Sequence, residues 1–536
     1  MIAFAALVDA LVYTRSRNGK LALIAQYLRT TPDPERGWAL AALTDGLDFP
    51  AVKASAVRTL LMSRVDPLLF QLSRDFVGDT AETASLLWPE PAGPQLPPPR
   101  VDEAVAALAA MTRASVQHDL AALLDRLDAD GRYALLKLAT GAMRLGISAR
   151  LAKVAFAQAF AVAVEEVEEY WHGQVPPYLP LFDWAANGAP PPSDEDLPLF
   201  RPFMLAHPLE DGAAPDLSAY AAEWKWDGIR VQVVCNGQAT RVYSRSGDDI
   251  SASFPEIAAA LPVPAVLDGE LLVRGSYQGA AEGGAASFNA LQQRLGRKTV
   301  SRAMLADYPA FVRLYDALII AGEDLRPFAW EQRRLALEAL VPRLDPARFD
   351  LSALIPAQSF ADLAEIRSGA RDAAIEGVML KRRDSPYVAG RRTGLWYKWK
   401  RDPLLADCVL MYAQRGSGKR SSFYSDFTFG CWAGEPDADG LGGSELLPVG
   451  KAYFGFTDEE LKWLDRYVRQ HTVNRFGPVR ETDRSLVLEV AFDSIHASKR
   501  HKSGLAMRFP RIHRIRADKP AREADRIETL RAQVAD

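Results

Sequence analysis

Two proline-rich stretches interrupt the first 200 residues and limit what this part of the chain can form. One runs from Trp88 to Pro99 and the other from Pro176 to Pro192. Proline lacks a backbone donor and cannot continue a helix, so such stretches usually lie in exposed connections. Between and before them the apolar residues have helical spacing. We therefore expect an all-α domain over residues 1–197.

Helical spacing is clearest in a run of leucines that recur at i, i+3, i+4 and i+7: Leu120, Leu123, Leu124 and Leu127. Gly131 is expected to end this helix. The apolar segment 1–13 has neither a basic start nor a cleavage-like site, so it predicts a helix and not a signal peptide.

Length and composition bound the class of protein. A chain of 536 residues suggests roughly three or four domains. Hydrophobic residues at 48% and charged residues at 25% exclude a disordered or fibrous chain. Cys235, Cys408 and Cys431 lie too far apart for a disulfide framework or a paired-cysteine zinc site. With no apolar run of about 20 residues, we expect a cytoplasmic protein, nucleoid-associated if bacterial.

The pattern changes after Phe203. Polar and apolar residues alternate over 229–233, as in a half-buried strand, and 265–273 also predicts a strand. Helical patterns return over 330–340 and 360–368. These segments predict an α+β domain over residues 198–402.

Short β-rich runs recur in the last part of the chain, over 408–413, 422–432 and 486–492. A Gly/Asp-rich break over 435–446 separates two of them. This pattern favours a small β-barrel of the OB-fold type over residues 403–536.

A lysine before a tight turn is the first candidate for chemistry. Lys225 precedes Asp227-Gly228, just before the predicted strand that contains Arg230. A lysine becomes a nucleophile once its ammonium loses a proton. The alternative interpretation is a surface β-turn, because Asp-Gly is a common turn pair. Lys225 alone does not decide between the two.

The residues that follow favour chemistry, because their order supplies every part that nucleotidyl transfer needs. The set comprises an arginine at a turn, a carboxylate in a strand, an aromatic ring beside an acid, a second carboxylate, and two lysines on one face of a strand: Arg245, Glu270, Tyr315, Glu376, Lys398 and Lys400.

This order resembles the collinear motifs of the covalent nucleotidyltransferases, specifically of ATP-dependent DNA ligases, over residues 200–520. The segment Arg508 to Lys519 is similar to the last ligase motif, which RNA-capping guanylyltransferases lack. More loosely, Thr14 to Lys20 and Thr140 to Gly146 resemble the helical DNA-binding domain of longer bacterial members. The chain lacks the cysteine clusters of an NAD-dependent ligase.

The resemblance implies roles around the nucleotide. Lys225 would become the lysyl-AMP and must attack the α-phosphate of ATP as the free base. Glu223 would accept from the adenine amino group, and Tyr315 would stack on adenine where many members have Phe. Arg230 and Arg245 would contact ribose or phosphate. The triphosphate would be bound by Arg392, Lys398 and Lys400.

The resemblance also implies a metal and a mobile last motif. Glu270, which would hold the ribose hydroxyl or a metal-bound water, and Glu376 would bind Mg²⁺, with Mn²⁺ as an alternative. Arg516 and Lys519 would orient pyrophosphate as the leaving group of the first step only. The C-terminal domain would then turn away about a hinge near 401–403.

Basic clusters support a nucleic-acid partner. Residues 381–401 and 499–519 each hold eight Lys or Arg against one acid, although the whole chain has a net charge of −4. Such focused charge is typical of phosphate-backbone binding. The predicted DNA contacts are Arg15, Arg17, Lys20, Arg144, Lys419 and Arg420. The segment 415–420 resembles a P-loop fragment but lacks its first glycine and its Ser or Thr, and is interpreted as a basic β-turn.

We therefore predict an ATP-dependent DNA ligase that seals nicks in duplex DNA as a monomer. An RNA ligase or capping-type enzyme is the alternative within the enzyme class. A non-catalytic scaffold that binds nucleic acid is the alternative outside it. The sequence indicates neither a protein partner nor a repair or replication pathway.

Overall fold

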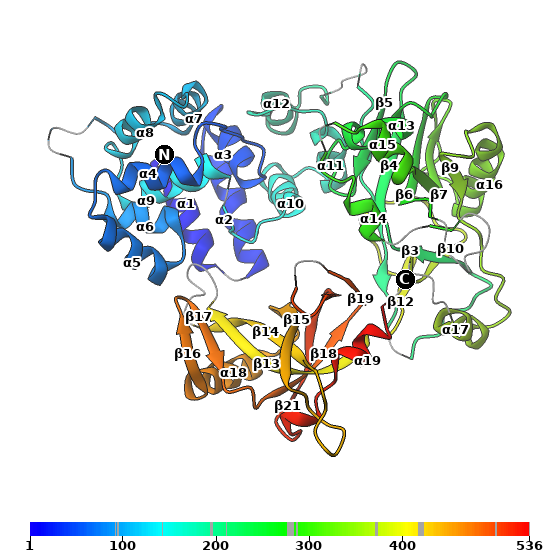
Figure 1. Cartoon of the computed structure of the whole chain (residues 1–536). Helices are drawn as coiled ribbons and strands as arrows, with labels where there is room; N and C mark the ends of the chain where they lie inside the picture. The colour runs from blue at the N-terminus through cyan, green and yellow to red at the C-terminus, as the bar shows by residue number, and fades with distance from the viewer. Residues whose placement is uncertain are drawn as a thin grey trace. The chain divides into compact units, whose positions relative to one another are not determined.

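The computed structural model describes the chain apart from residues 15, 92, 94–95, 142, 193–196, 211, 276–283, 286–287, 298, 370–373, 416–422, 499–500 and 535–536 (Figure 1). The chain forms two compact units, of which one comprises residues 1–159 and 403–536 and the other residues 160–402. None of the described helices combines the length and apolar character that a membrane span requires.

Helices fill the first part of the chain, as expected. They are α1 (Ile2–Tyr13), α2 (Arg17–Thr30), α3 (Glu35–Leu43), α4 (Ala54–Met62), α5 (Pro67–Val77), α6 (Thr80–Leu87), α7 (Val101–Ala110), α8 (Val116–Leu124), α9 (Ala129–Thr140) and α10 (Ala149–Phe160). The α9 helix is largely buried and packs against α1, α6 and α7. Even Lys137 of α9 is buried, where its ammonium pairs with Asp79.

The expected helix end at Gly131 is wrong. The helix that carries Leu120 ends at Leu124, and Gly131 lies in the first turn of α9. Asp128 is the N-cap of α9, and its carboxylate accepts a hydrogen bond from the Gly131 amide at 2.8 Å. A short side chain that satisfies a free helix amide starts a helix, and here it outweighs the helix-breaking tendency of glycine.

The second unit begins with α11 (Val164–Trp171) and α12 (Leu179–Asn187). The sequence placed these helices in the N-terminal domain, but α11 binds residues of the α+β region. Its Glu169 pairs with Arg326 at 2.8 Å, and the ring of His172 lies 3.3 Å from the Gly247 carbonyl. Residues 160–197 therefore group with 198–402.

A six-stranded sheet forms one layer of the second unit, in the order β5-β4-β6-β7-β8 with β9 also paired to β7. Its strands are β4 (Ile229–Cys235), β5 (Thr240–Ser244), β6 (Ala265–Val273), β7 (Ala310–Ile320), β8 (Glu323–Asp324) and β9 (Phe349–Leu351). Three helices accompany it: α13 (Pro255–Ala258), α14 (Phe288–Gln292) and α15 (Arg302–Asp307). Apolar residues of α16 (Trp330–Leu340) and α13 complete its core. The predicted strands over 229–233 and 265–273 and the predicted helix over 330–340 are confirmed.

The second unit also contains a four-stranded sheet, whose strands pair in the order β2-β12-β10-β3. Its strands are β2 (His207–Pro208), β3 (Tyr220–Trp226), β10 (Ile375–Arg382) and β12 (Trp396–Lys400); β1 (Met204–Leu205) pairs with β11 (Gly390–Arg391). One face is apolar and packs on α17 (Phe360–Gly369), where Phe360 stacks on Trp399 with ring centres 4.7 Å apart. This packing leaves the other face for polar side chains.

The last part of the chain is β-rich. Its elements are β13 (Leu404–Arg415), β14 (Tyr424–Ala433), β15 (Glu445–Ala452), α18 (Asp458–Gln470), β16 (Thr472–Phe476), β17 (Val479–Thr482), β18 (Val487–Phe492), β19 (Ser494–Ala497), β20 (Leu505–Arg508), β21 (Arg511–Arg516) and α19 (Ile527–Arg531). The long strand β13 pairs with β14, β17 and β18. Within the described residues, no strand pair joins β21 to β15, so the sheet is a half-barrel and a closed barrel remains a prediction.

Candidate active site

The polar face of the four-stranded sheet brings together lysines of β3 and β12, the two strands that flank β10. Antiparallel pairing places Lys225 of β3 opposite Gly377 of β10, and Gly377 opposite Lys400 of β12. The adjacent row consists of Glu223, Met379 and Lys398. Directly opposite residues in antiparallel strands share a face, and every second residue returns to that face. Strand pairing alone therefore gathers the predicted nucleophile and two predicted phosphate-binding lysines.

Glu376 reaches this face through a β-bulge. Lys225 pairs with Gly377, whereas the next residue, Trp226, pairs with Ile375, so Glu376 is an inserted residue in β10. A bulge changes the direction of the inserted side chain. The Glu376 carboxylate accepts a hydrogen bond from Lys225 Nζ and lies 3.5 Å from Lys400 Nζ. Regular alternation would have pointed this acid away from both lysines.

Gly377 must be glycine for the strands to come this close. Its φ is +153°, and a Cβ at this position would lie 2.2 Å from the backbone oxygen of Trp399. Any side chain would therefore push β10 away from β12. The missing side chain also leaves the space between Lys225 and Lys400 open.

Glu223 is buried beneath this face. Only 1% of it is exposed, and both of its carboxylate oxygens lie 3.3 Å from Lys381 Nζ. Arg334 of α16 lies 3.7 Å from one of these oxygens. Burial raises the pKa of Glu223, and the charges of Lys381 and Arg334 oppose this shift.

Arg230 lies on β4 of the larger sheet and binds protein groups. Its guanidinium donates to both oxygens of Asp268 at 3.1 and 2.7 Å, and to the Met204 carbonyl at 2.8 Å. The Tyr387 hydroxyl donates to the same Asp268 at 2.7 Å. Arg230 therefore joins β4, β6 and the segment around Tyr387, and a contact with ribose or phosphate remains a prediction.

Glu270 and Tyr315 meet at the edge of the same region. The Gly228 amide donates to Glu270 Oε1 at 3.2 Å, and the Tyr315 hydroxyl donates to Glu270 Oε2 at 3.5 Å. Burial raises the pKa of Glu270 to about 8, and the carboxylates of Glu376 and Asp227 add to the shift. Glu270 is therefore mostly protonated at neutral pH when no cation is bound nearby.

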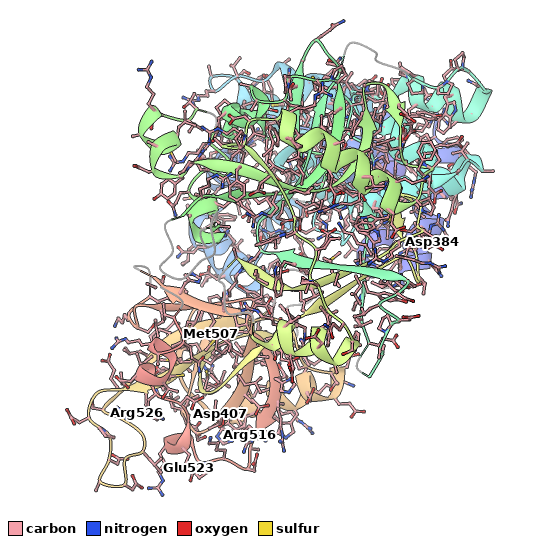
Figure 2. All side chains as sticks on the ribbon, turned by 90° about the vertical axis from the view of Figure 1, so that its right-hand side faces the viewer. Asp384, Asp407, Met507, Arg516, Glu523 and Arg526 are labelled. Carbon is pink, nitrogen blue, oxygen red and sulfur yellow. The ribbon has the colours of Figure 1, made fainter. Side chains whose placement is uncertain are left out.

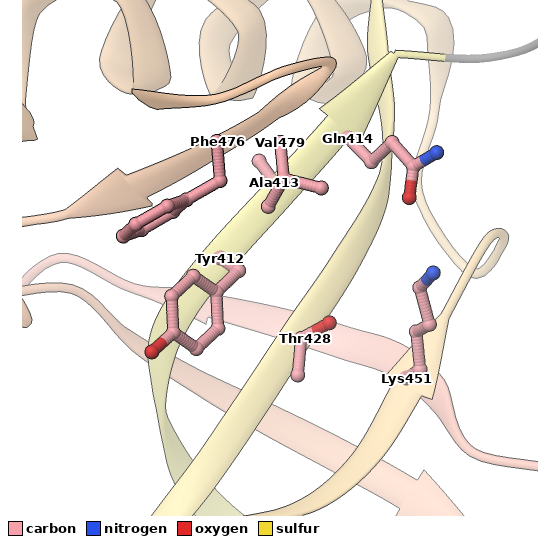
Figure 3. Close-up of a pocket in the computed structure, with 7 residues that line it drawn as sticks. All are labelled: Tyr412, Ala413, Gln414, Thr428, Lys451, Phe476 and Val479. Carbon is pink, nitrogen blue, oxygen red and sulfur yellow. The ribbon is translucent and has the colours of Figure 1, made fainter. Parts of the chain in front are cut away.

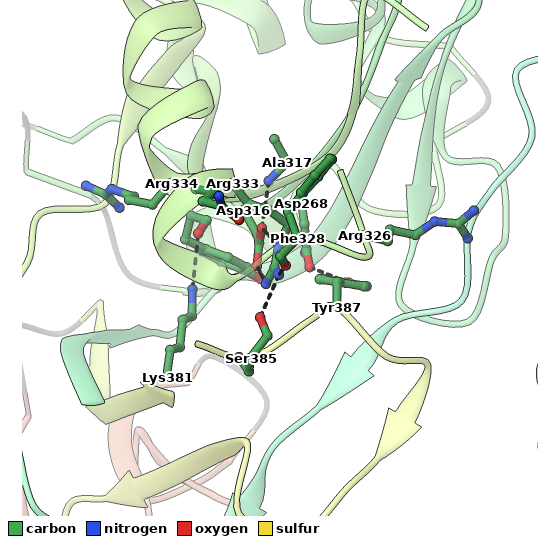
Figure 4. A network of polar contacts seen from close by, with 12 residues as sticks. Asp268, Asp316, Ala317, Arg326, Phe328, Arg333, Arg334, Lys381, Ser385 and Tyr387 are labelled. Carbon is green, nitrogen blue, oxygen red and sulfur yellow. Dashed lines mark hydrogen bonds and ion pairs between the residues drawn. The ribbon is translucent and has the colours of Figure 1, made fainter. Parts of the chain in front are cut away.

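Fully buried ion pairs fix the strands beneath the site (Figure 4). Asp316 of β7 binds Arg333 of α16 through two hydrogen bonds of 2.8 and 3.0 Å, and neither side chain is exposed. Arg333 also donates to the Ser385 carbonyl at 2.8 Å. These bonds hold the strand of Tyr315 and the segment that follows β10 in one arrangement.

Lys398 lies among other cations. Its pKa is lowered by burial first and then by the positive charges of Arg391, Lys225, Lys400 and Arg245. The exposed turn that carries Arg245 follows β5. Such a concentration of positive charge favours a polyanion.

Arg392 differs from its neighbour Arg391. Its guanidinium pairs with Glu165 of α11, so the structure does not bring it to the lysines. Arg391, which the sequence analysis did not single out, acts on Lys398 electrostatically. Two adjacent arginines cannot be told apart by sequence when a distant acid decides which of them is engaged.

Arg516 and Lys519 belong to the other unit. Figure 2 shows Arg516 beside Asp407 of β13, and Lys519 contacts the same acid. Lys519 Nζ is 2.7 Å from Asp407 Oδ2, and Arg516 is 3.6 Å from the same oxygen. Arg516 also pairs with Asp518 at 3.1 Å. Both predicted pyrophosphate ligands are thus held by acids of their own unit.

The two helical stretches with predicted DNA contacts converge. Lys20 of α2 donates to the carbonyl of Leu145, which joins segments 125 residues apart. Arg17 and Arg144 are both exposed. Outside the described residues lie Arg15, Lys419 and Arg420. The same holds for residues 416–420 of the predicted turn.

A pocket of about 310 Å³ lies on the half-barrel sheet, and none of its lining residues is a predicted site residue (Figure 3). Its lining residues are Tyr412, Ala413, Gln414, Thr428, Lys451, Phe476 and Val479. The predicted site is instead an open strand face with a buried polar layer beneath it.

Sequence analysis did not identify three residues that shape the site: Lys381, Met379 and Asp268. Alternation along β10 would have placed Met379 and Lys381 on the face of Gly377. No local signal marked Asp268 as the partner of Arg230, because that choice depends on how β4 and β6 align.

Two family models match the chain. The ATP dependent DNA ligase domain matches residues 203–400, and the ATP dependent DNA ligase C terminal region matches residues 420–519.

Related proteins match most of the chain. A probable DNA ligase of Koribacter versatilis is 35% identical over 438 residues, which are 76% of this chain and 72% of that protein. A probable DNA ligase of Anaeromyxobacter sp. (strain Fw109-5) is 37% identical over 473 residues, 85% of this chain and 87% of that protein. The solved structure of Pmar-Lig_PreS3 shares the fold, with a TM-score of 0.57 and 17% identity over 96% of this chain and 99% of that one.

Proposed function

Because the chain belongs to the ATP-dependent DNA ligase family, we propose that Lys225 is the residue that carries AMP during nick sealing. The protein is an ATP-dependent DNA ligase. In the family mechanism, a lysine takes AMP from ATP, AMP passes to the 5′-phosphate at a nick, and the 3′-hydroxyl then expels AMP. The observation that supports Lys225 is its place on the sheet face shared with Glu376 and Lys400.

The first step requires Lys225 to act as a free amine. In the unliganded site its ammonium donates to Glu376, so it must leave that carboxylate and lose a proton before attack. Bond formation from Nζ to the α-phosphorus then breaks the bond to pyrophosphate. Lys398 and Lys400 neutralise the charge that develops on the phosphate oxygens.

Glu223 and Tyr315 bind the base in this proposal. Glu223 accepts from the adenine amino group, and the Tyr315 ring stacks on adenine. Arg230, whose guanidinium is bound to Asp268, supports the ribose side of the site through its exposed part. Arg245 contacts the phosphates, and the position of Arg391 near Lys398 gives it the same role. Arg392 joins them only after its guanidinium leaves Glu165.

A divalent cation fits this site. Mg²⁺ typically binds one or two carboxylates and takes its other ligands from phosphates and water. No group of three or more metal-binding side chains occurs in the described part of the chain. Glu270 and Glu376 are close enough for the charge of Glu376 to raise the pKa of Glu270, an arrangement that a cation stabilises. Bound Mg²⁺, or Mn²⁺, would supply charge neutralisation at the triphosphate.

The C-terminal region acts in the first step through Arg516 and Lys519, which orient pyrophosphate. We propose that it completes an OB-fold barrel and turns about residues 401–403 between steps. The proposed functional divisions are residues 1–197 for DNA binding, 198–402 for adenylation and 403–536 for the OB-fold domain, with residues 160–197 packed in the same unit as the adenylation domain.

The substrate of the family is nicked DNA. We propose that Arg15, Arg17, Lys20, Arg144, Lys419 and Arg420 contact its phosphates and that the enzyme acts as a cytoplasmic monomer. Repair and replication are the processes that such ligases typically serve.

Incubation with ATP labelled at the α-phosphate tests the assignment of Lys225. Wild-type protein should become covalently labelled with AMP, and Lys225→Ala should not. The variant should still close a nick whose 5′-phosphate already carries AMP, because that step needs no lysyl-AMP. Labelling of Lys225→Ala would overturn the assignment. Comparison of nicked DNA with nicked RNA tests the strand preference.

A further inference from the structure

A buried lysine links the two residues proposed to bind the base. Lys381 of β10 is 1% exposed, and its ammonium lies 3.3 Å from each oxygen of Glu223. It also donates to the backbone carbonyl of Tyr315 at 3.2 Å. The three donors of an ammonium thus meet three acceptors, which fixes Glu223 relative to the strand of Tyr315.

The surroundings favour the charged form of Lys381. Its Nζ lies 4.3 Å from the ring centre of Tyr315 and 4.7 Å from that of Trp396, distances typical of cation–π contacts. An uncharged amine has only two donors and could not meet all three acceptors. Burial lowers the pKa of Lys381, and the charge of Glu223 opposes this shift.

Glu223 faces more positive than negative charge. Lys381 lies on one strand beside it, and Arg334 of α16, which is always charged, lies 3.7 Å away. The nearby acids are already neutralised, since Asp316 of β7 binds Arg333 (Figure 4) and Asp268 of β6 binds Arg230. These cations oppose the rise in pKa that burial causes for Glu223.

We propose that Lys381 is a positioning residue that sets the base specificity of self-adenylation by holding Glu223 in its ionised, acceptor-only form. This proposal rests on the proposed function, in which Glu223 accepts from the adenine amino group. A carboxylate only accepts hydrogen bonds, whereas a protonated carboxyl also donates one. The 6-oxo group of hypoxanthine or guanine needs a donor, so an ionised Glu223 rejects ITP and GTP.

The test compares ATP with ITP, which differ at this position of the base. The rates of Lys225 labelling give kcat/KM for each nucleotide in wild type and in Lys381→Met. We expect the ATP-to-ITP ratio to fall roughly tenfold or more in the variant, the effect of an altered buried hydrogen bond. The ratio in the variant should then rise with pH as Glu223 ionises, because burial raises the pKa of Glu223 and Lys381 no longer opposes this shift. In wild type the ratio should not change with pH.

Two further variants separate this role from a structural one. Glu223→Gln should reduce the ratio at every pH, because an amide both donates and accepts. Adding Lys381→Met to Glu223→Gln should not reduce it further. Arg382→Met removes the next cation along β10, which pairs with Asp384 at the surface, and should leave the ratio and its pH profile unchanged.

Each outcome is decisive. Equal slowing with ATP and ITP at all pH values would overturn the role of Lys381. If thermal melting shows that Lys381→Met is not folded, Lys381→Gln replaces it, because the glutamine amide retains a donor for Glu223. An unchanged ratio in Glu223→Gln would instead overturn the role of Glu223 in base binding. Absence of Lys225 labelling in wild type would overturn the proposed function itself.

Discussion

Lys225 donates a hydrogen bond to Glu376, the inserted residue of the bulge in β10. The proposed nucleophile of the first step is therefore bound to a carboxylate that is also a proposed metal ligand. A divalent cation at Glu376 would compete with the Lys225 ammonium for the same oxygens. Metal binding would then be coupled to release of Lys225 through one side chain.

This coupling predicts that removal of divalent cations with a chelator abolishes labelling of Lys225 by ATP. Glu376→Gln should lower the labelling rate by about 10²–10³-fold, as for loss of one charge-stabilising group, and should raise the Mg²⁺ concentration needed for half-maximal rate. Glu331→Gln is the matched control, because Glu331 pairs with Arg383 at the surface. An unchanged metal requirement in Glu376→Gln would contradict the coupling.

Stability should depend on pH through Glu270. Burial raises the pKa of Glu270 from 4.5 to about 8 in the folded protein, so the folded state binds more protons than the unfolded state between these values. Stability must then fall as pH rises through this range. Glu270→Gln removes this effect. In urea unfolding, the free energy of unfolding of Glu270→Gln relative to wild type should rise from about pH 5 to pH 8. A constant difference between the two proteins would refute the raised pKa.

Asp407 should restrain Lys519. The 2.7 Å ion pair must break before Lys519 reaches pyrophosphate, and a charge-assisted hydrogen bond contributes about 1.5–3 kcal/mol. Lys519→Ala should slow Lys225 labelling about 10²–10³-fold and largely spare closure of a pre-adenylated nick. Asp407→Asn should instead accelerate labelling, by about 10²-fold at most, which is the upper end of that free energy. Slower labelling in Asp407→Asn would show that this carboxylate helps to present Lys519.

Salt dependence should identify the DNA contacts of the helical region. Arg17→Ala and Arg144→Ala should each reduce the slope of log affinity against log salt by about 0.9, since each lost phosphate contact releases one fewer counterion. Arg29→Ala removes another exposed arginine of α2 and should leave the slope unchanged. Binding of nicked duplex measured at several salt concentrations checks both. Equal slopes in all three variants would exclude these contacts.

Elements with a strong local pattern could be predicted from the sequence. Alternation placed strands at 229–233 and 265–273, and periodicity placed the helix at 330–340. The helix end predicted at Gly131 is wrong because Asp128, the N-cap of α9, accepts a hydrogen bond from the Gly131 amide and so starts a helix there. Local patterns therefore predict these strands and this helix, but they give a wrong position for one helix end.

Partners across the fold could not be predicted in the same way. The resemblance singled out Glu376, but the hydrogen bond with Lys225 depends on a bulge that no local pattern indicates. The pairing of Arg392 with Glu165 joins residues 227 positions apart, and its geometry follows from how α11 packs. Such pairs arise from strand register and helix packing and are not encoded by nearby residues.

Because of the bulge, the number of residues in β10 decides whether a carboxylate lies beside Lys225. Strand β10 contains one more residue than its pairing with β3 uses at this point. Deletion of that residue would allow an ordinary ladder, and the core on the other face would still be complete. The resulting protein would keep its fold and lose its acid beside Lys225. At this point of the chain, an insertion or deletion is therefore a functional change even where it is structurally silent.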